Sequence, residues 1–338
     1  MKYLNLICLS ALTFCFWPAS APVADVATLC RIAEAQRDVS YVGVRLKTLG
    51  TSRGTKTMEE LVIHRSAAHS YRKVLSIVGE KQPAERERKR DADNRTRRRR
   101  GKERGRGREL SKWERNRSQF SDKEIELIAQ NYHLKLEESG EKTLGYETAV
   151  LVVKPKLPQR PSKYITFARK NGVILEVKDL DSEGTLREMF AYTRLSFEQE
   201  VVQAQWQKYQ NEIHVAPRRS QPVSQEDASA LLSGKLVQPA YLPPGFQLLE
   251  LRSIKERRAI HLTYTDGLLG FSIFETAGSR MRGDRRGEVI HLNGTDVYKH
   301  ERGHEDVFIW KHADIVFFLY GAVPSSEKLK VVESIVKR

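Results

Sequence analysis

The chain is 338 residues long, 40% of them hydrophobic, and it carries a formal net charge of +15. This length allows two domains with a core each, and the composition excludes a wholly disordered chain. Residues 81–118 hold 17 Lys/Arg and 7 Asp/Glu, which is +10 of the total. The remaining +5 is ordinary for a soluble protein, so the net charge does not make the whole chain a nucleic-acid-binding protein.

The N-terminus has the pattern of a secretory signal. Lys2 precedes an apolar run from Tyr3 to Trp17, and the small residues Ala19-Ser20-Ala21 follow it. The run is too short to span a bilayer comfortably. We therefore predict a periplasmic protein with residues 1–24 as signal peptide, or a membrane-anchored one if the signal is not cleaved. Cys30 is then the one cysteine left, and we expect it to be buried rather than bridged to another chain.

Residues 25–198 are predicted to form a first domain. Apolar residues at helical spacing predict a helix over 24–39, and Ser121 with Glu124 forms a capping box for a second, short helix. Alternating runs predict the strands 41–46, 57–65, 69–78, 132–137, 147–154, 164–168, 174–179 and 187–197. We expect an antiparallel β half-barrel packed on helices, whose apolar interior could hold a ligand.

A basic insertion, residues 81–118, interrupts this domain. It includes the run Arg97, Arg98, Arg99 and Arg100 and has almost no apolar residues, so it cannot bury enough surface to order itself. We interpret it as a disordered, solvated surface loop. Contact between these arginines and an anionic membrane surface is one alternative. Nucleic-acid binding is another, but no nucleic acid is expected as partner of an exported protein.

Residues 199–235 are predicted to be a linker: Glu198 to Ile213 is helical or linker-like, and Val215 to Glu226 is polar and rich in Pro and Ser. A smaller C-terminal α+β domain, 236–338, follows. It opens with a rigid Leu-Pro-Pro-Gly-Phe corner, residues 242–246, then one strand, a Thr-Asp-Gly turn at 265–267 and a second strand containing Phe271 to Glu275. Further strands are expected at 288–292, 295–300, 306–311 and 315–320, with a closing amphipathic helix over 325–336.

One motif has the pattern of a catalytic site. His300-Glu301-Arg302-Gly303-His304 matches H-E-x-x-H, the zinc signature of metalloproteases, which requires a helix so that both imidazoles share a face. The residues on either side have strand character and Gly303 is suited to a hairpin turn, so we interpret the motif as a turn. The chain is predicted not to be an enzyme and to need no metal or cofactor, with a metalloprotease as a remote alternative.

Several short motifs occur in a fixed order along the chain. In the first half they include Tyr41-Val42-Gly43, Ile63-His64, Asn131-Tyr132, Gly145, Lys154-Pro155 and the 174–190 hairpin. In the second half they are Leu242–Phe246, the run from His261 to Leu268, Ser272–Glu275, and Gly321-Ala322-Val323-Pro324. Each motif is weak alone, but together they cover nearly the whole chain after the signal, and their order and spacing resemble the MucB/RseB family of periplasmic regulators of the envelope-stress sigma factor pathway.

The resemblance implies a lipoprotein-carrier-like half-barrel that senses a lipid-like or lipoprotein signal. It also implies a second domain that binds the periplasmic region of a membrane-embedded anti-sigma factor. The basic insertion is a departure from the family. We predict that the partner surface consists of Leu242, Phe246, Tyr264, Asp266, Phe271 and Phe274. The alternative for Phe246, Tyr264 and Phe271 is that they are core residues, and the alternative function is a lipid or lipoprotein carrier.

Overall fold

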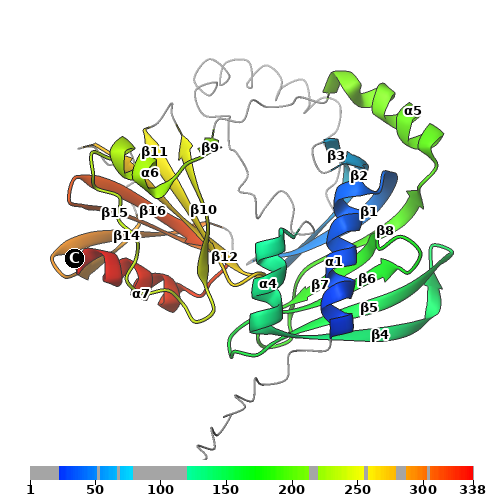
Figure 1. Cartoon of the computed structure of the whole chain (residues 1–338), viewed down its shortest axis with the longest axis horizontal. Helices are drawn as coiled ribbons and strands as arrows, with labels where there is room; N and C mark the ends of the chain where they lie inside the picture. The colour runs from blue at the N-terminus through cyan, green and yellow to red at the C-terminus, as the bar shows by residue number, and fades with distance from the viewer. Residues whose placement is uncertain are drawn as a thin grey trace, which may run out of the picture.

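The computed structural model describes residues 23–51, 54–66, 69–78, 120–212, 220–254, 258–278, 287–302 and 305–337. They form two antiparallel sheets of eight strands, one in each half of the chain (Figure 1). Residues 1–22 of the predicted signal peptide (1–24) and the basic insertion, including Arg97 to Arg100, lie outside the described residues.

The first sheet has the strand order β3-β2-β1-β8-β7-β6-β5-β4 and is not closed, because β3 and β4 are edges. Its strands are β1 (Tyr41–Thr51), β2 (Gly54–Ser66), β3 (His69–Val78), β4 (Tyr132–Thr143), β5 (Tyr146–Pro155), β6 (Ser162–Ala168), β7 (Ile174–Leu180) and β8 (Leu186–Ser196). Pairing of β1 with β8 joins the two meanders into one sheet. The predicted open antiparallel half-barrel is confirmed.

Two helices cover one face of this sheet, α1 (Val23–Asp38) and α4 (Asp122–Asn131). Leu29 and Ile32 of α1 and Ile128 of α4 share an apolar cluster with Leu151 and Ile165 of the sheet. The half-buried Cys30 packs at the edge of this cluster, more accessible than the sequence predicts. Helix α4 begins as predicted: Ser121 Oγ accepts the Glu124 N–H, and the Glu124 carboxylate accepts the Ser121 N–H.

The range predicted as a linker contains regular structure. Helix α5 (Gln199–Tyr209), followed by the 3₁₀ turn η1 (Gln210–Glu212), packs through Val202 on the face of the first sheet opposite α1. Strand β9 (Ser220–Pro222) pairs with the second sheet, and α6 (Gln225–Leu231) adds Ala228 to the second core. The passage between the two domains therefore falls between residues 212 and 220.

The second sheet has the order β13-β14-β15-β16-β12-β11-β10-β9. The remaining strands are β10 (Gln247–Ile254), β11 (Ala259–Thr265), β12 (Gly270–Ala277), β13 (Glu288–Leu292), β14 (Thr295–Arg302), β15 (Glu305–His312) and β16 (Ile315–Gly321). The prediction of a single strand before the Thr-Asp-Gly turn is wrong, because β10 and β11 form a hairpin there. Its tip is charged and lacks the usual Pro or Gly signal.

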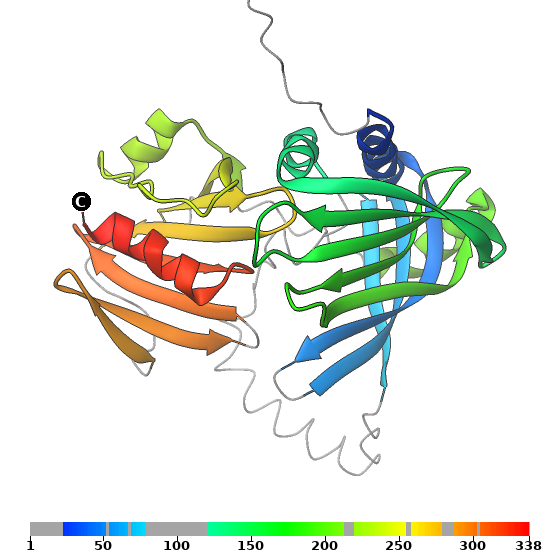
Figure 2. The ribbon, with the colours of Figure 1, turned by 90° about the horizontal axis from the view of Figure 1, so that it is seen from below.

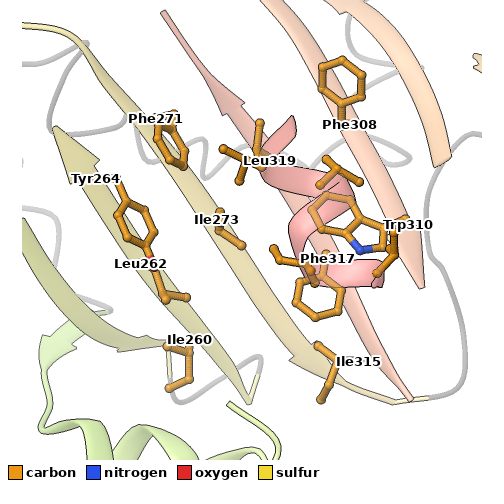
Figure 3. Close-up of a cluster of buried hydrophobic side chains, with 14 of the residues drawn as sticks. Ile260, Leu262, Tyr264, Phe271, Ile273, Phe308, Trp310, Ile315, Phe317 and Leu319 are labelled. Atoms are coloured by element: carbon orange, nitrogen blue, oxygen red, sulfur yellow. The ribbon is translucent and has the colours of Figure 1, made fainter. Parts of the chain in front are cut away.

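The second core lies between this sheet and α7 (Ser325–Val336). Alternate side chains of β11, β12, β15 and β16 point to the helix, as Figure 3 shows for Leu262, Ile273 and Phe317. Trp310 and Phe317 stack within it, with ring centroids 4.9 Å apart. Helices α6 and α7 both contribute to this core, so they lie on the same face of the sheet.

Candidate functional site: the junction between the domains

The Leu-Pro-Pro-Gly-Phe corner and the Thr-Asp-Gly turn lie side by side against the first domain. The corner closes with a hydrogen bond from the Phe246 N–H to the Pro243 carbonyl, 3.0 Å long. In both views α4 is the helix of the first domain that lies next to the second domain (Figures 1 and 2). The two motifs that stand out in the sequence of the second domain therefore form its contact with the first.

Asp266 is the centre of this junction and is 1% exposed. Its Oδ1 accepts the N–H groups of Leu268 and Leu269, at 3.0 and 2.7 Å, which fixes the turn. Its Oδ2 accepts the Tyr132 hydroxyl at 2.9 Å and lies 3.6 Å from Arg160 Nε, both from the first domain. Burial raises the pKa of the Asp266 carboxyl, while these hydrogen bonds and Arg160 act in the opposite direction.

Arg160, in the loop between β5 and β6, is the main residue of the first domain at this junction. It is 7% exposed, donates from Nη2 to the Pro244 carbonyl at 2.9 Å, and lies 4.7 Å above the Phe246 ring. A guanidinium suits this position because it can hydrogen-bond in its plane while its face stacks on an aromatic ring. Arg160 thus holds the corner and the turn together.

Helix α4 supplies further polar contacts. Asn131 Nδ2 donates to the carbonyls of both Gly245 and Asp266, each at 3.0 Å. Lys123, at the start of α4, donates to the Leu248 carbonyl at 2.6 Å. These bonds pair side chains of α4 with backbone carbonyls of the corner, the turn and β10.

Two glycines allow the backbones to come this close. A Cβ on Gly245 would lie 2.3 Å from Asn131 Oδ1, and one on Gly267 would lie 2.7 Å from the Ile128 nitrogen. Both glycines also have positive φ, +81° and +105°, which side chains disfavour. Leu268 then packs against the core cluster of the first domain. The junction is therefore tightly packed as well as hydrogen-bonded.

The structure separates the predicted partner-surface residues into three groups. Phe246, Tyr264 and Phe271 are at most 5% exposed and stack in the second core, which is the alternative that the sequence left open. Asp266 lies in the junction. Leu242 and Phe274 are half-buried, and Phe274 lies on the sheet face opposite α7, stacked on His261 with centroids 4.2 Å apart. Leu242 and Phe274 are thus the two of the six with exposed surface that a partner could touch.

The sequence prediction did not include Arg160, Asn131 or Tyr132 as site residues. Asn131-Tyr132 was one of the motifs behind the family resemblance, so a signal for that pair existed. Arg160 lies in a Pro-flanked loop, where a lone arginine is ordinarily solvated, and nothing local indicates that it is buried.

The first sheet contains more buried charge than the predicted apolar interior of the half-barrel implies. Arg45 pairs with Glu60 at 2.8 Å and Lys47 with Glu188 at 3.0 Å, and Lys163 pairs with Asp179. All six side chains are at most 20% exposed. One pocket among the described residues has a volume of about 520 Å³. It lies beside α5 and is lined by Ser40, Arg65, Ser66, His69, Gln199, Val202 and Gln203.

His300 and Glu301 are on a strand and not on the helix that the H-E-x-x-H zinc signature requires. His300 and Glu301 are on strand β14, paired with Val307 and Asp306 of β15, so their side chains point to opposite faces. His304 lies outside the described residues. Within the residues that are described, no group of three or more His, Cys, Asp or Glu is placed to hold a metal ion.

No protein-family model matches the chain, and no curated protein matches it. Among solved structures it is similar to the Pseudomonas aeruginosa MucA/MucB complex, with 21% identity, 92% of this chain and 98% of that chain covered, and a TM-score of 0.49. MucB in complex with MucA(peri) gives 20% identity, coverage of 91% and 97%, and a TM-score of 0.48. These structures belong to the family that the sequence motifs resemble.

A domain described as an outer membrane lipoprotein-sorting protein, from Vibrio parahaemolyticus, is a more distant neighbour. It is 10% identical, covers 52% of this chain and 97% of its own length, and has a TM-score of 0.21. Across the described ranges of the chain, no helix is both long and apolar enough to cross a membrane.

Proposed function

We propose that this chain is a non-enzymatic periplasmic regulator that binds the periplasmic region of a membrane-embedded anti-sigma factor. The observation that carries the proposal is the position of the family-like motifs. Asn131-Tyr132 of the first domain meets Leu242–Phe246 and the Thr-Asp-Gly turn of the second, far apart in the sequence. A single motif match is weak support for a family. Motifs that meet at one junction in the structure are expected to share a function.

The first domain is the part that we assign to sensing a lipid-like or lipoprotein signal. An acyl chain needs exposed apolar surface. Val74 and Leu75 on the edge strand β3 are 49% and 43% exposed and can supply some of it. The buried ion pairs of the half-barrel disfavour an acyl chain among them, so we place the lipid contact at the β3 edge.

The partner surface that we propose on the second domain is the aromatic face around Phe274. The ring of Phe274 stacks between His261 and Tyr320, with centroids 4.2 and 5.9 Å away. Half-exposed aromatic residues are common anchors in protein interfaces. A peptide that crosses this face would cover the Phe274 and Tyr320 rings.

The test is direct binding of the chain, without its signal peptide, to the periplasmic region of the anti-sigma factor from the same genome, measured by calorimetry. We expect a dissociation constant of about 1 µM or tighter, which corresponds to roughly −8 kcal/mol. Phe274→Ser is expected to weaken binding at least tenfold, and Val289→Ser on the exposed edge strand β13 serves as the matched control. A folded chain that shows no binding at ~100 µM would overturn the proposal, and co-purified lipid in that case would favour the carrier alternative.

A further inference from the structure

The side chain of Arg160 contacts the opposite domain at three places. Its ion pair with Asp266, its hydrogen bond to the Pro244 carbonyl and its stacking on Phe246 all cross the junction. Asn131 likewise donates both of its side-chain hydrogen bonds to the second domain. These two residues therefore contribute to how the domains are held together more than to either fold.

The chemistry of the junction favours two states rather than gradual loosening. Arg160 and Asp266 are 7% and 1% exposed, and removing ions of this kind from water is costly unless their partners stay in place. If the two domains separated only slightly, Arg160 and Asp266 would lose their contacts with each other before water molecules could reach them. The junction is expected to be either closed or fully hydrated.

Helix α4 links the junction to the interior of the half-barrel. Ile128 is fully buried in the core of the first domain, and its backbone nitrogen also borders Gly267 of the turn. Tyr132, the first residue of β4, is fully buried and donates its hydroxyl to Asp266. A shift of α4 on the sheet would therefore move the residues that hold Asp266.

We propose that the contact of Arg160, Asn131 and Tyr132 with the corner and the turn is a lock between the domains. Displacement of α4 on the half-barrel opens this lock. Opening changes which surface of the second domain is presented, so the lock connects an event in the first domain to binding by the second. This last step rests on the proposed function, whereas the lock itself does not.

The lock is tested by measuring the distance between the domains in the chain without its signal peptide. Spin labels are attached at Lys142→Cys and Asp296→Cys in a Cys30→Ser background, both on exposed positions. The parent chain is expected to give one narrow distance distribution. Arg160→Met keeps the apolar stem and removes the ion pair and hydrogen bond, so it should give a broader distribution with a longer mean. Arg194→Met, on the exposed surface of β8, is the control and should leave the distribution unchanged.

One further variant keeps the test decisive. If Arg160→Met lowers the helix and strand content seen by circular dichroism, Asn131→Ala replaces it, because Asn131 is only half-buried and its hydrogen bonds cross the junction. An unchanged distance distribution in a folded Arg160→Met or Asn131→Ala chain would overturn the lock.

Partner binding separates the lock from the proposed function. In the anti-sigma binding assay, Arg160→Met is expected to change the dissociation constant by about fivefold or more, a coupling of ordinary size. Arg194→Met should stay within twofold. Binding that is equal in all three chains, together with an open Arg160→Met chain, would support the lock but reject its link to the partner. An unchanged distance with normal binding would reject the lock and leave the proposed function standing.

Discussion

Single residues in the second core show how strongly burial controls charge. Glu275 is 0% exposed, and its Oε2 accepts the Val237 N–H at 3.1 Å. Its Oε1 has no partner among the described residues. Burial raises the pKa of this carboxyl from 4.5 to about 8, and the Val237 N–H offsets only part of that effect. The folded protein therefore holds a proton on Glu275 at neutral pH.

A prediction about pH follows from this proton. Between about pH 4.5 and pH 8 the folded state binds more protons at Glu275 than the unfolded state, so the contribution to stability is present at low pH and lost as the pH rises. Glu275→Gln removes this contribution. Urea unfolding at pH 5 and pH 8.5 should show that the parent loses a few kcal/mol more than Glu275→Gln. Glu301→Gln, which removes an exposed carboxylate from β14, should behave like the parent.

Arg160 shows the limit of prediction from sequence at this scale. The buried apolar residues Ile128, Leu151 and Phe317 follow from the spacing of apolar side chains along their elements. The burial of Arg160 depends on Asp266 and Phe246, which the chain brings near only after both domains have formed. A prediction from local pattern has no access to such a partner, and for the same reason it left open whether Phe246 lies on the surface or in the core.

At the scale of elements, clear sequence patterns were sufficient to predict a helix or a strand, and weak patterns were not. The capping box at Ser121 predicted the start of α4 to the residue, and alternation predicted all eight strands of the first sheet. The β10–β11 hairpin was missed because a charged tip joins the two strands. Strand β9 and helix α6 were missed because they are short, polar, and stabilised by pairing with the second domain.

The cap of α4 provides a test at this scale. Ser121→Ala removes the hydroxyl that accepts the Glu124 N–H, and Glu124 is itself 4% exposed. We expect a loss of about 1 kcal/mol in the free energy of unfolding of the first domain. Ser224→Ala is the matched control, because Ser224 caps α6 through the Asp227 N–H and should affect the second domain instead. Unfolding is followed by hydrogen exchange, which reports the two domains separately. Equal protection of the first domain in the parent and in Ser121→Ala would contradict the prediction.

At the scale of the whole molecule, the basic residues of the insertion and the residues of the junction come from different parts of the chain. The insertion joins β3, an edge strand, to the residues before α4. Phe120, at its end, is buried in the first core and fixes the return of the chain. Because β3 and α4 are formed on either side of it, we predict that the charge of residues 81–118 is not needed for the fold or for the interdomain contacts described above.

Deletion of residues 84–117 tests this separation. The variant keeps Phe120 and the Ser121 cap, so the half-barrel and the junction should form, and the domain-to-domain distance should match the parent. Binding to vesicles of anionic lipid at low salt should weaken strongly, because the attraction between exposed charges is lost, and the difference should shrink as salt is raised to 0.5 M. A deletion variant that unfolds would show that the insertion is structural. Unchanged vesicle binding would instead place the membrane contact on other basic residues, and the anionic-surface prediction for Arg97 to Arg100 would then be wrong.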